Sequence, residues 1–286
     1  MPVALFTSSP FAVDFVQRAL LGGAFVSILC GVVGTWVVIR GMAFLGEALA
    51  HGMLPGVALA TVLSLPVLAG GAVSAVAMSV GIGALQRRAK LSYDTSIGLL
   101  FVSMLALGVI IISHSGSFAT DATAILFGDI LAISPGDLVL LGVAAAAGVT
   151  LAALFHRSFV ALSLDVRIAA VLGLRPRTAQ AALVGLVTLA IVASYQAVGS
   201  MLVVGLLLAP AVAAAQWTDR IPSRMVLACL FGIAAVVLGL LASWYAATAA
   251  GASVTAAAIV LAALSWAVRA VIARRRRSVH PSVATA

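Results

Sequence analysis

The sequence predicts an all-α, polytopic membrane protein with about nine transmembrane helices, and three observations support this fold class. Of the 286 residues, 64% are hydrophobic and 8% are charged, whereas a soluble domain carries about 25% charged residues. The mean hydropathy is +1.25. The hydrophobic runs are continuous, which excludes the alternating strands of an outer-membrane β-barrel. We expect residues 1–286 to form a single transmembrane domain, with a helical core at about 15–273 and a basic cytoplasmic tail at 274–286.

Six hydrophobic blocks, separated by polar residues, give the expected helices in chain order. A helix needs about 20 residues to cross the hydrocarbon core of a bilayer. Three blocks are each expected to form one span: 19–39, 95–113 and 138–155. Three others are too long for a single span: 42–86, 179–215 and 225–273.

Each of the long blocks contains residues that predict a break near its middle. In chain order, the predicted breaks are Pro66 with Gly70–Gly71, Tyr195–Gln196 with Gly199, and residues 250–253. Splitting the three long blocks at these points gives nine spans.

The basic residues orient these spans, because lysine and arginine favour the cytoplasmic ends of membrane helices. With the N-terminus outside and the C-terminus in the cytoplasm, all of the 16 basic residues except Arg18 lie on the cytoplasmic side. Leaving any long block unsplit puts arginine clusters on both sides. The net charge of +8 is therefore interpreted as basic cytoplasmic loops, in reach of anionic membrane lipids, and not as a nucleic-acid site.

Motifs for nucleotide binding and for intramembrane catalysis are absent from the sequence. The only lysine, Lys90, is not part of a G-x-x-x-x-G-K-[ST] loop, so ATP hydrolysis would require another chain. H-E-x-x-H, C-x-x-C and G-x-S-x-G motifs are absent as well. Cys30 and Cys229 lie inside hydrophobic runs, and we expect no disulfide. Transport, and not enzyme activity, is the predicted class of function.

One span carries an acid and a histidine well inside the membrane. Glu47 and His51 are four residues apart, so a helix places them on one face. Counted from Arg40, they lie about 10 Å and about 16 Å deep, near the bilayer midplane. A carboxylate and an imidazole suit a divalent cation such as Zn²⁺ or Mn²⁺; the alternatives are hydrogen bonds to neighbouring helices or a proton relay. Gly52 and Pro55 predict a break after His51.

The segment that contains this pair, RGMAFLGEALAHGMLPGVALA (40–60), resembles the signature of the permease subunit of metal-ion ABC importers, the zinc, manganese and iron family. Four further segments match that family in the expected order: DTSIGLLFVSMLALGVIIIS (94–113), LFGDIL (126–131), DVRIAAVLGLRP (165–176) and VGSMLVVGLLLAPAVAAA (198–215). The matches extend over most of the chain between residues 15 and 270.

The resemblance implies a homodimeric permease in the bacterial plasma membrane. Such a permease is driven by two cytoplasmic ABC ATPase subunits, which use the ATP, and receives metal from an extracytoplasmic metal-binding protein. The implied cargo is zinc or manganese, with iron as a further candidate, and no permanently bound cofactor is implied. In the family the acid at the position of Glu47 is commonly Asp, whereas His51 fits the pattern.

The predicted outer loop, which follows residue 113, has a histidine and two acids, His114, Asp121 and Asp129, and Asp137 follows it. An acidic entrance would concentrate cations, whereas the alternative for each acid is a helix cap in a solvated loop. Because Asp129 lies within the family-like LFGDIL, it is the candidate that we assign to the metal path.

The segment 163–176 is predicted to form a short cytoplasmic helix. Ser163 and Asp165 are candidate N-caps, and Gly173 and Pro176 are candidate stop signals. The resemblance implies that this is the coupling helix that contacts the ATPase, and the assigned contact residues are Asp165, Arg167, Ala169, Leu172 and Gly173. The alternative is a connector without a partner.

Two other transporter classes are left open by the residues. A permease for a metal chelate would need a wider, uncharged path without a mid-membrane acid–histidine pair. A proton-coupled secondary transporter would use Glu47 and His51 as its relay, and its gene would lack an ATPase gene beside it.

Overall fold

The computed structural model describes residues 13–89, 91–114, 130–165, 171 and 173–279. Over these residues the chain is helical and contains no strand. Within the described ranges, nine helical segments are long and apolar enough to cross a membrane. The predicted fold class and the predicted number of spans are therefore confirmed.

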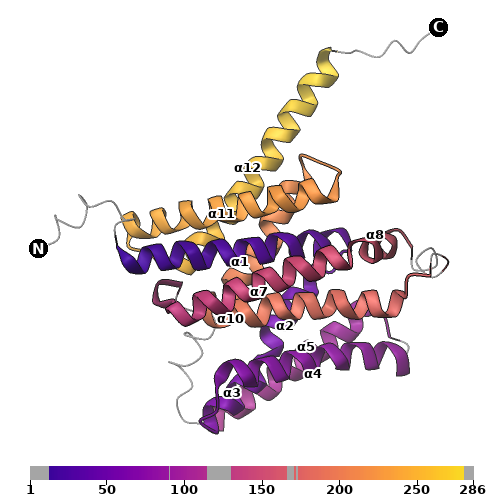
Figure 1. The fold of residues 1–286 in the computed structure, drawn as a ribbon, viewed down its shortest axis with the longest axis vertical. Coiled ribbons are helices and arrows are strands. Elements are labelled where there is room, and N and C mark those ends of the chain that lie inside the picture. The colour runs from indigo at the N-terminus through magenta and orange to yellow at the C-terminus, as the bar shows by residue number, and fades with distance from the viewer. Residues whose placement is uncertain (1–12, 90, 115–129, 166–170, 172, 280–286) are drawn as a thin grey trace, which may run out of the picture.

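Figure 1 shows the helices of the described residues. In chain order they are α1 (Asp14–Ile39), α2 (Ala43–Gly52), α3 (Leu54–Val62), α4 (Val67–Arg88), α5 (Tyr93–His114), the 3₁₀ turn η3 (Ile130–Ala132), α7 (Pro135–Leu154), α8 (His156–Leu164), α10 (Pro176–Ala215), α11 (Ile221–Ala246) and α12 (Ala250–Val279). Helices α2 and α3 together form one span, and α10 supplies two, at 176–195 and 198–215.

Helix α10 changes direction where the second break was predicted. Gly199 has φ 73° and ψ 166°, a conformation outside the helical region that favours glycine. The 40 residues of α10 are therefore two helices joined at a sharp turn. This break is confirmed at the residue level.

The other two breaks lie a few residues before some of the glycines that predicted them. Helix α4 begins directly after Pro66, so Gly70 and Gly71 are inside it. A methyl group on Gly56 of α3 would lie 2.0 Å from the carbonyl oxygen of Gly70, which shows that these glycines serve close helix packing. The third break lies at Ala247, which is left-handed, and residues 250–253 form the first turn of α12.

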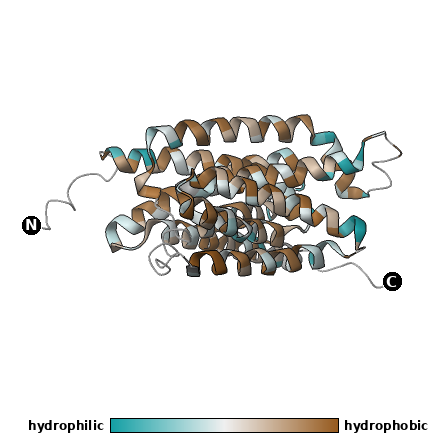
Figure 2. Cartoon of the chain, turned by 90° about the horizontal axis from the view of Figure 1, so that it is seen from below, coloured by the Kyte–Doolittle hydropathy of each residue, from teal (hydrophilic) through white to brown (hydrophobic). Residues whose placement is uncertain are grey.

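Helices α1 and α10 form the centre of the bundle. Helix α1 packs against α10, α11 and α7, and its large side chains Leu29 and Trp36 are fully buried. Helix α12 lies at one edge and the group α3, α4 and α5 at the opposite edge (Figure 1). Hydrophobic residues cover the middles of the helices and hydrophilic residues gather toward their ends, as a membrane protein requires (Figure 2).

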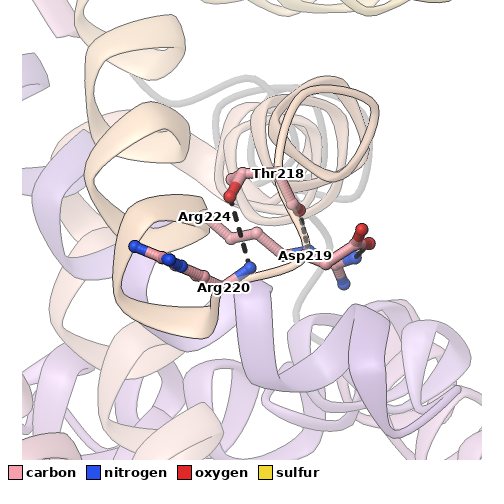
Figure 3. Close-up of polar contacts among 4 residues, drawn as sticks. All are labelled: Thr218, Asp219, Arg220 and Arg224. Carbon is pink, nitrogen blue, oxygen red and sulfur yellow. Dashed lines mark hydrogen bonds and ion pairs between the residues drawn. The ribbon is translucent and has the colours of Figure 1, made fainter.

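The connection between α10 and α11 is fixed by an arginine. Arg224 donates from Nε to the carbonyl oxygen of Thr218 at 2.6 Å and from a terminal nitrogen to the Asp219 carboxylate at 3.1 Å. The hydroxyl oxygen of Thr218 accepts from the backbone N–H of Arg220 at 3.2 Å (Figure 3). These contacts hold the corner at which α11 begins.

Candidate metal path

Helix α2 and helix α3 are separated by one residue, as the sequence predicted. Met53 lies between them with φ −75° and ψ −22°, so the span bends without leaving the helical region. Pro55 lies in the first turn of α3, where a missing N–H costs no in-helix hydrogen bond. Ser74 of α4 donates to the carbonyl oxygen of Gly52 at 2.7 Å and thus satisfies an acceptor at the break.

Small residues bring the neighbouring helices close to this span. A methyl group on Gly46 would lie 2.8 Å from Cδ2 of Leu207 in α10. A methyl group on Gly52 would lie 2.1 Å from the sulfur of Met78 in α4. The span therefore packs between α10 and α4, and most of its residues are buried.

Glu47 and His51 meet on this span. His51 Nε2 and Glu47 Oε1 are 2.9 Å apart, within hydrogen-bond distance. The His51 side chain is 21% exposed and the Glu47 side chain is 43% exposed. The His51 ring also lies edge-on against Phe101 of α5, with ring centroids 5.8 Å apart. The contact with Glu47 uses Nε2, which leaves Nδ1 of His51 as the second ring nitrogen.

The pair lies on an open stripe of an otherwise buried helix. We call the open stripe the residues Phe44, Glu47, His51, Pro55 and Leu59, which succeed one another at three- and four-residue intervals and so share one helix face. Phe44 is 44% exposed and Leu59 48% exposed. A carboxylate and an imidazole therefore point into a space that this single chain leaves uncovered.

Comparison with known proteins shows which family this chain resembles. The family model described as the ABC 3 transport family matches residues 12–269. The chain is 34% identical to the manganese transport system membrane protein MntC of Listeria monocytogenes, over 90% of this chain and 91% of that protein. It is 33% identical to the chelated iron transport system membrane protein YfeD of Yersinia pestis, over 83% and 80%.

A solved structure agrees with the sequence matches. The complex PsaBC from Streptococcus pneumoniae with Fab contains a chain that superposes with a TM-score of 0.80 and 32% identity. The match covers 93% of this chain and 95% of that one.

This chain belongs to the ABC 3 transport family. The resemblance found in its sequence motifs is thereby confirmed. As an ABC 3 permease it is a multi-pass protein of the bacterial plasma membrane. Membership in an ABC family also argues against the proton-coupled secondary transporter.

Of the acids predicted on the outer side, Asp137 lies among the described residues of the ABC 3 permease. Asp121 and Asp129 lie outside the described residues, so the assignment of Asp129 to the metal path stays a prediction. Asp137 forms a capping box with Ser134 at the start of α7, which is the alternative role considered for it. Within the described residues, no group of three or more His, Cys, Asp or Glu side chains surrounds a common point.

The predicted coupling segment is described at its two ends. Ser163 lies in the last turn of α8 and donates to the carbonyl oxygen of Val160, so it does not begin a new helix. Asp165 is the C-cap of α8, with extended backbone. Gly173 has φ 71°, as expected for a stop signal. Arg167, Ala169 and Leu172 lie outside the described residues, and the ATPase contacts stay a prediction.

Pro176 has a different role from the one predicted. It is the first residue of α10, where proline is favoured because the first helical N–H needs no partner. The proline therefore starts the next span and does not stop the preceding helix.

Two residues next to the metal pair were missed in the sequence. Phe101 carries no sequence signal, because an aromatic residue in a hydrophobic span is equally compatible with lipid contact. Ser74 did have a signal, because it follows Gly70 by four residues in a small-xxx-small pattern typical of helix contacts.

Proposed function

We propose that this permease conducts a divalent transition metal into the cytoplasm through a site in which Glu47 and His51 are two of the ligands. The supporting observation is their placement side by side on the open stripe of a buried span. Charged residues inside a membrane are costly and mark functional sites. A carboxylate oxygen and an imidazole nitrogen are ligands for Mn²⁺, Fe²⁺ and Zn²⁺.

A second copy of the chain completes the site in this proposal. An acidic side chain that faces lipid near the bilayer centre costs about 2.5–3.5 kcal/mol, so Glu47 needs a cover other than lipid. Two ligands from one chain are too few for a metal site, whereas a two-fold axis beside the open stripe brings together two pairs. Two acids and two histidines then supply four protein ligands, and water molecules can complete the six that Mn²⁺ prefers.

Manganese is the first candidate cargo in this proposal. Some relatives are named for manganese and for iron, and the oxygen of Glu47 suits Mn²⁺ better than a sulfur ligand would. Zinc shares the same acid and histidine ligands and remains a second candidate cargo. The name of YfeD supports a metal chelate as a further alternative cargo.

The orientation and the partners follow from charge and from the missing nucleotide motif. Placing the N-terminus outside and the C-terminus inside puts the basic ends of the helices in the cytoplasm. Residues 163–176 then lie on the cytoplasmic side, where two ATPase subunits would contact them. The opposite side receives the metal from an extracytoplasmic binding protein, and Asp129 would lie at that entrance.

Element-resolved metal uptake tests this function. Cells that lack their own importers would express the complete transporter with the parent permease, Glu47→Gln or His51→Ala, at matched membrane levels. Loss of a metal ligand is expected to reduce uptake of the cargo metal at least about tenfold in both variants. Asp219→Asn, a change at a fully exposed acid outside the open stripe, is the control and should transport like the parent.

The same experiment identifies the cargo. Manganese, zinc and iron are counted together, with iron offered free and as a chelate whose organic part is labelled. Entry of the label with iron would support the chelate alternative. Parent-like uptake by both site variants would contradict the assignment of the pair.

A further inference from the structure

Arg40 lies at the cytoplasmic corner between α1 and α2. The N–H of Gly41 donates to the carbonyl oxygen of Val38 at 3.2 Å, and the N–H of Met42 donates to that of Val37 at 2.9 Å. With Gly41 at φ 64°, this is a Schellman motif, and Arg40 is the helix C-cap. The corner therefore fixes the direction in which α2 leaves α1.

The guanidinium of Arg40 joins two other helices. One terminal nitrogen donates to the carbonyl oxygen of Leu162, in the last turn of α8. The other donates to Oε1 of Gln180, near the start of α10, at 3.2 Å. The Leu162 carbonyl is one of the last four of its helix, which have no acceptor role inside the helix. Arg40 thus bonds the helix that ends just before residues 165–175 and the helix that begins just after them.

The surroundings strengthen these two hydrogen bonds. Burial lowers the pKa of the Arg40 guanidinium from its ordinary value, while the nearby Tyr93 acts in the opposite direction. Arginine nevertheless stays charged in proteins. Charge-assisted hydrogen bonds in a half-buried site are about twice as strong as neutral ones. The contact therefore ties both ends of the segment to the corner where α2 begins.

We propose that Arg40 is a positioning residue for energy coupling: it transmits movement of the end of α8 and the start of α10 to α2, which carries Glu47 and His51. This inference rests on the proposed function, because it takes 165–175 as the ATPase contact and Glu47 and His51 as the metal pair. Ala43, the first residue of α2, follows Arg40 by three residues, and Glu47 lies four residues further along α2, about 6 Å. A displacement of these two helix ends therefore reaches Glu47 through one side chain, the corner and the first turn of α2.

The test measures metal uptake and ATP hydrolysis separately in the complete transporter. The permease and its ATPase are reconstituted in liposomes, with the binding protein and Mn²⁺ outside. In Arg40→Gln, ATP hydrolysis should stay within about twofold of the parent. The amount of Mn²⁺ transported per ATP should fall about tenfold, because the variant loses one or two charge-assisted hydrogen bonds. A purely structural role would lower uptake and hydrolysis in proportion, and that result would overturn the proposal.

Arg224→Gln is the matched control. Arg224 also donates to a backbone carbonyl and a side-chain oxygen at a helix corner, but it does not touch the ends of residues 165–175 (Figure 3). Its ratio of Mn²⁺ to ATP should match the parent. An equal fall of this ratio in both arginine variants would overturn the special role of Arg40.

Gln180→Ala keeps the proposal testable if Arg40→Gln does not assemble. It removes one acceptor of the guanidinium and leaves the Leu162 bond in place, so the ratio should fall severalfold; an unchanged ratio would overturn the proposal. Metal uptake by the parent transporter tests the proposed function in the same assay. A parent transporter that moves no metal contradicts the proposed function, whereas a transporting parent with unchanged variants contradicts the role of Arg40 alone.

Discussion

Glu47 is the only glutamate of the chain, and it lies on the open stripe of a helix that is otherwise buried. Its contact with His51 orients both groups toward the same space. The four-residue spacing predicted this pair, because side chains four apart share a helix face. The edge contact of His51 with Phe101 was not predictable, because it depends on how α5 packs beside α2.

The length of the acid should matter less than its charge. Glu47→Asp shortens the side chain by one methylene and keeps the ligand oxygens, so Mn²⁺ uptake should stay within about tenfold of the parent. Glu47→Gln should be lower than Glu47→Asp at every Mn²⁺ concentration. Initial uptake rates over a concentration series check this, and equal rates for the two variants would show that the negative charge has no role.

Ser74 should stabilise the break beside the metal pair. Ser74→Ala leaves the Gly52 carbonyl without its side-chain donor, which costs about 1–3 kcal/mol for a buried acceptor. The purified permease should therefore unfold at a lower temperature. Ser103→Ala is the control, because the Ser103 hydroxyl donates within its own helix on an exposed face. An equal change in both variants would contradict this role of Ser74.

At the scale of the helices, the sequence predicted the number of spans correctly, whereas two of the three breaks lie a few residues from where they were predicted. Hydrophobic length gives the count of spans, because the bilayer sets the length of each helix. Glycine has two uses that a single sequence does not separate. Gly199 is needed for a positive φ at a break, whereas Gly70 and Gly71 lie inside α4, where Gly70 meets α3.

The packing role of glycine predicts opposite outcomes at two sites. Gly56→Ala puts a methyl group 2.0 Å from a backbone oxygen of α4, which neither helix can avoid without moving. The variant should lose several kcal/mol of stability or fail to assemble, on the order of the largest packing defects. Gly98→Ala meets nothing within 4 Å and should stabilise α5 by about 0.5–1 kcal/mol. Thermal unfolding in detergent compares them, and a tolerated Gly56→Ala would contradict the described α3–α4 packing.

The whole chain has an odd number of candidate spans among its described residues, so its two ends are expected on opposite faces of the membrane. Arginine placement decides which face is which in our proposal. The two-fold axis that completes the site in our proposal was not derivable from spacing within one chain. The exposure of Glu47, which only the packed helices reveal, supports it.

Cysteine labelling in intact cells tests the orientation. In a background without Cys30 and Cys229, Ser64→Cys between α3 and α4 should react with an impermeant thiol reagent from outside. Asp219→Cys, at the fully exposed corner between α10 and α11, should react only after the membrane is opened. The reverse pattern would contradict an outer N-terminus.

The number of metal ions bound per permease chain tests the proposed metal site shared between two copies. Mn²⁺ binding is measured by electron paramagnetic resonance on the detergent-purified transporter at known permease concentration. We expect one tightly held Mn²⁺ for every two permease chains, and we expect the signal of bound Mn²⁺ to be lost in both Glu47→Gln and His51→Ala. One ion per chain, or an unchanged signal in the two variants, would contradict a metal site shared between two copies.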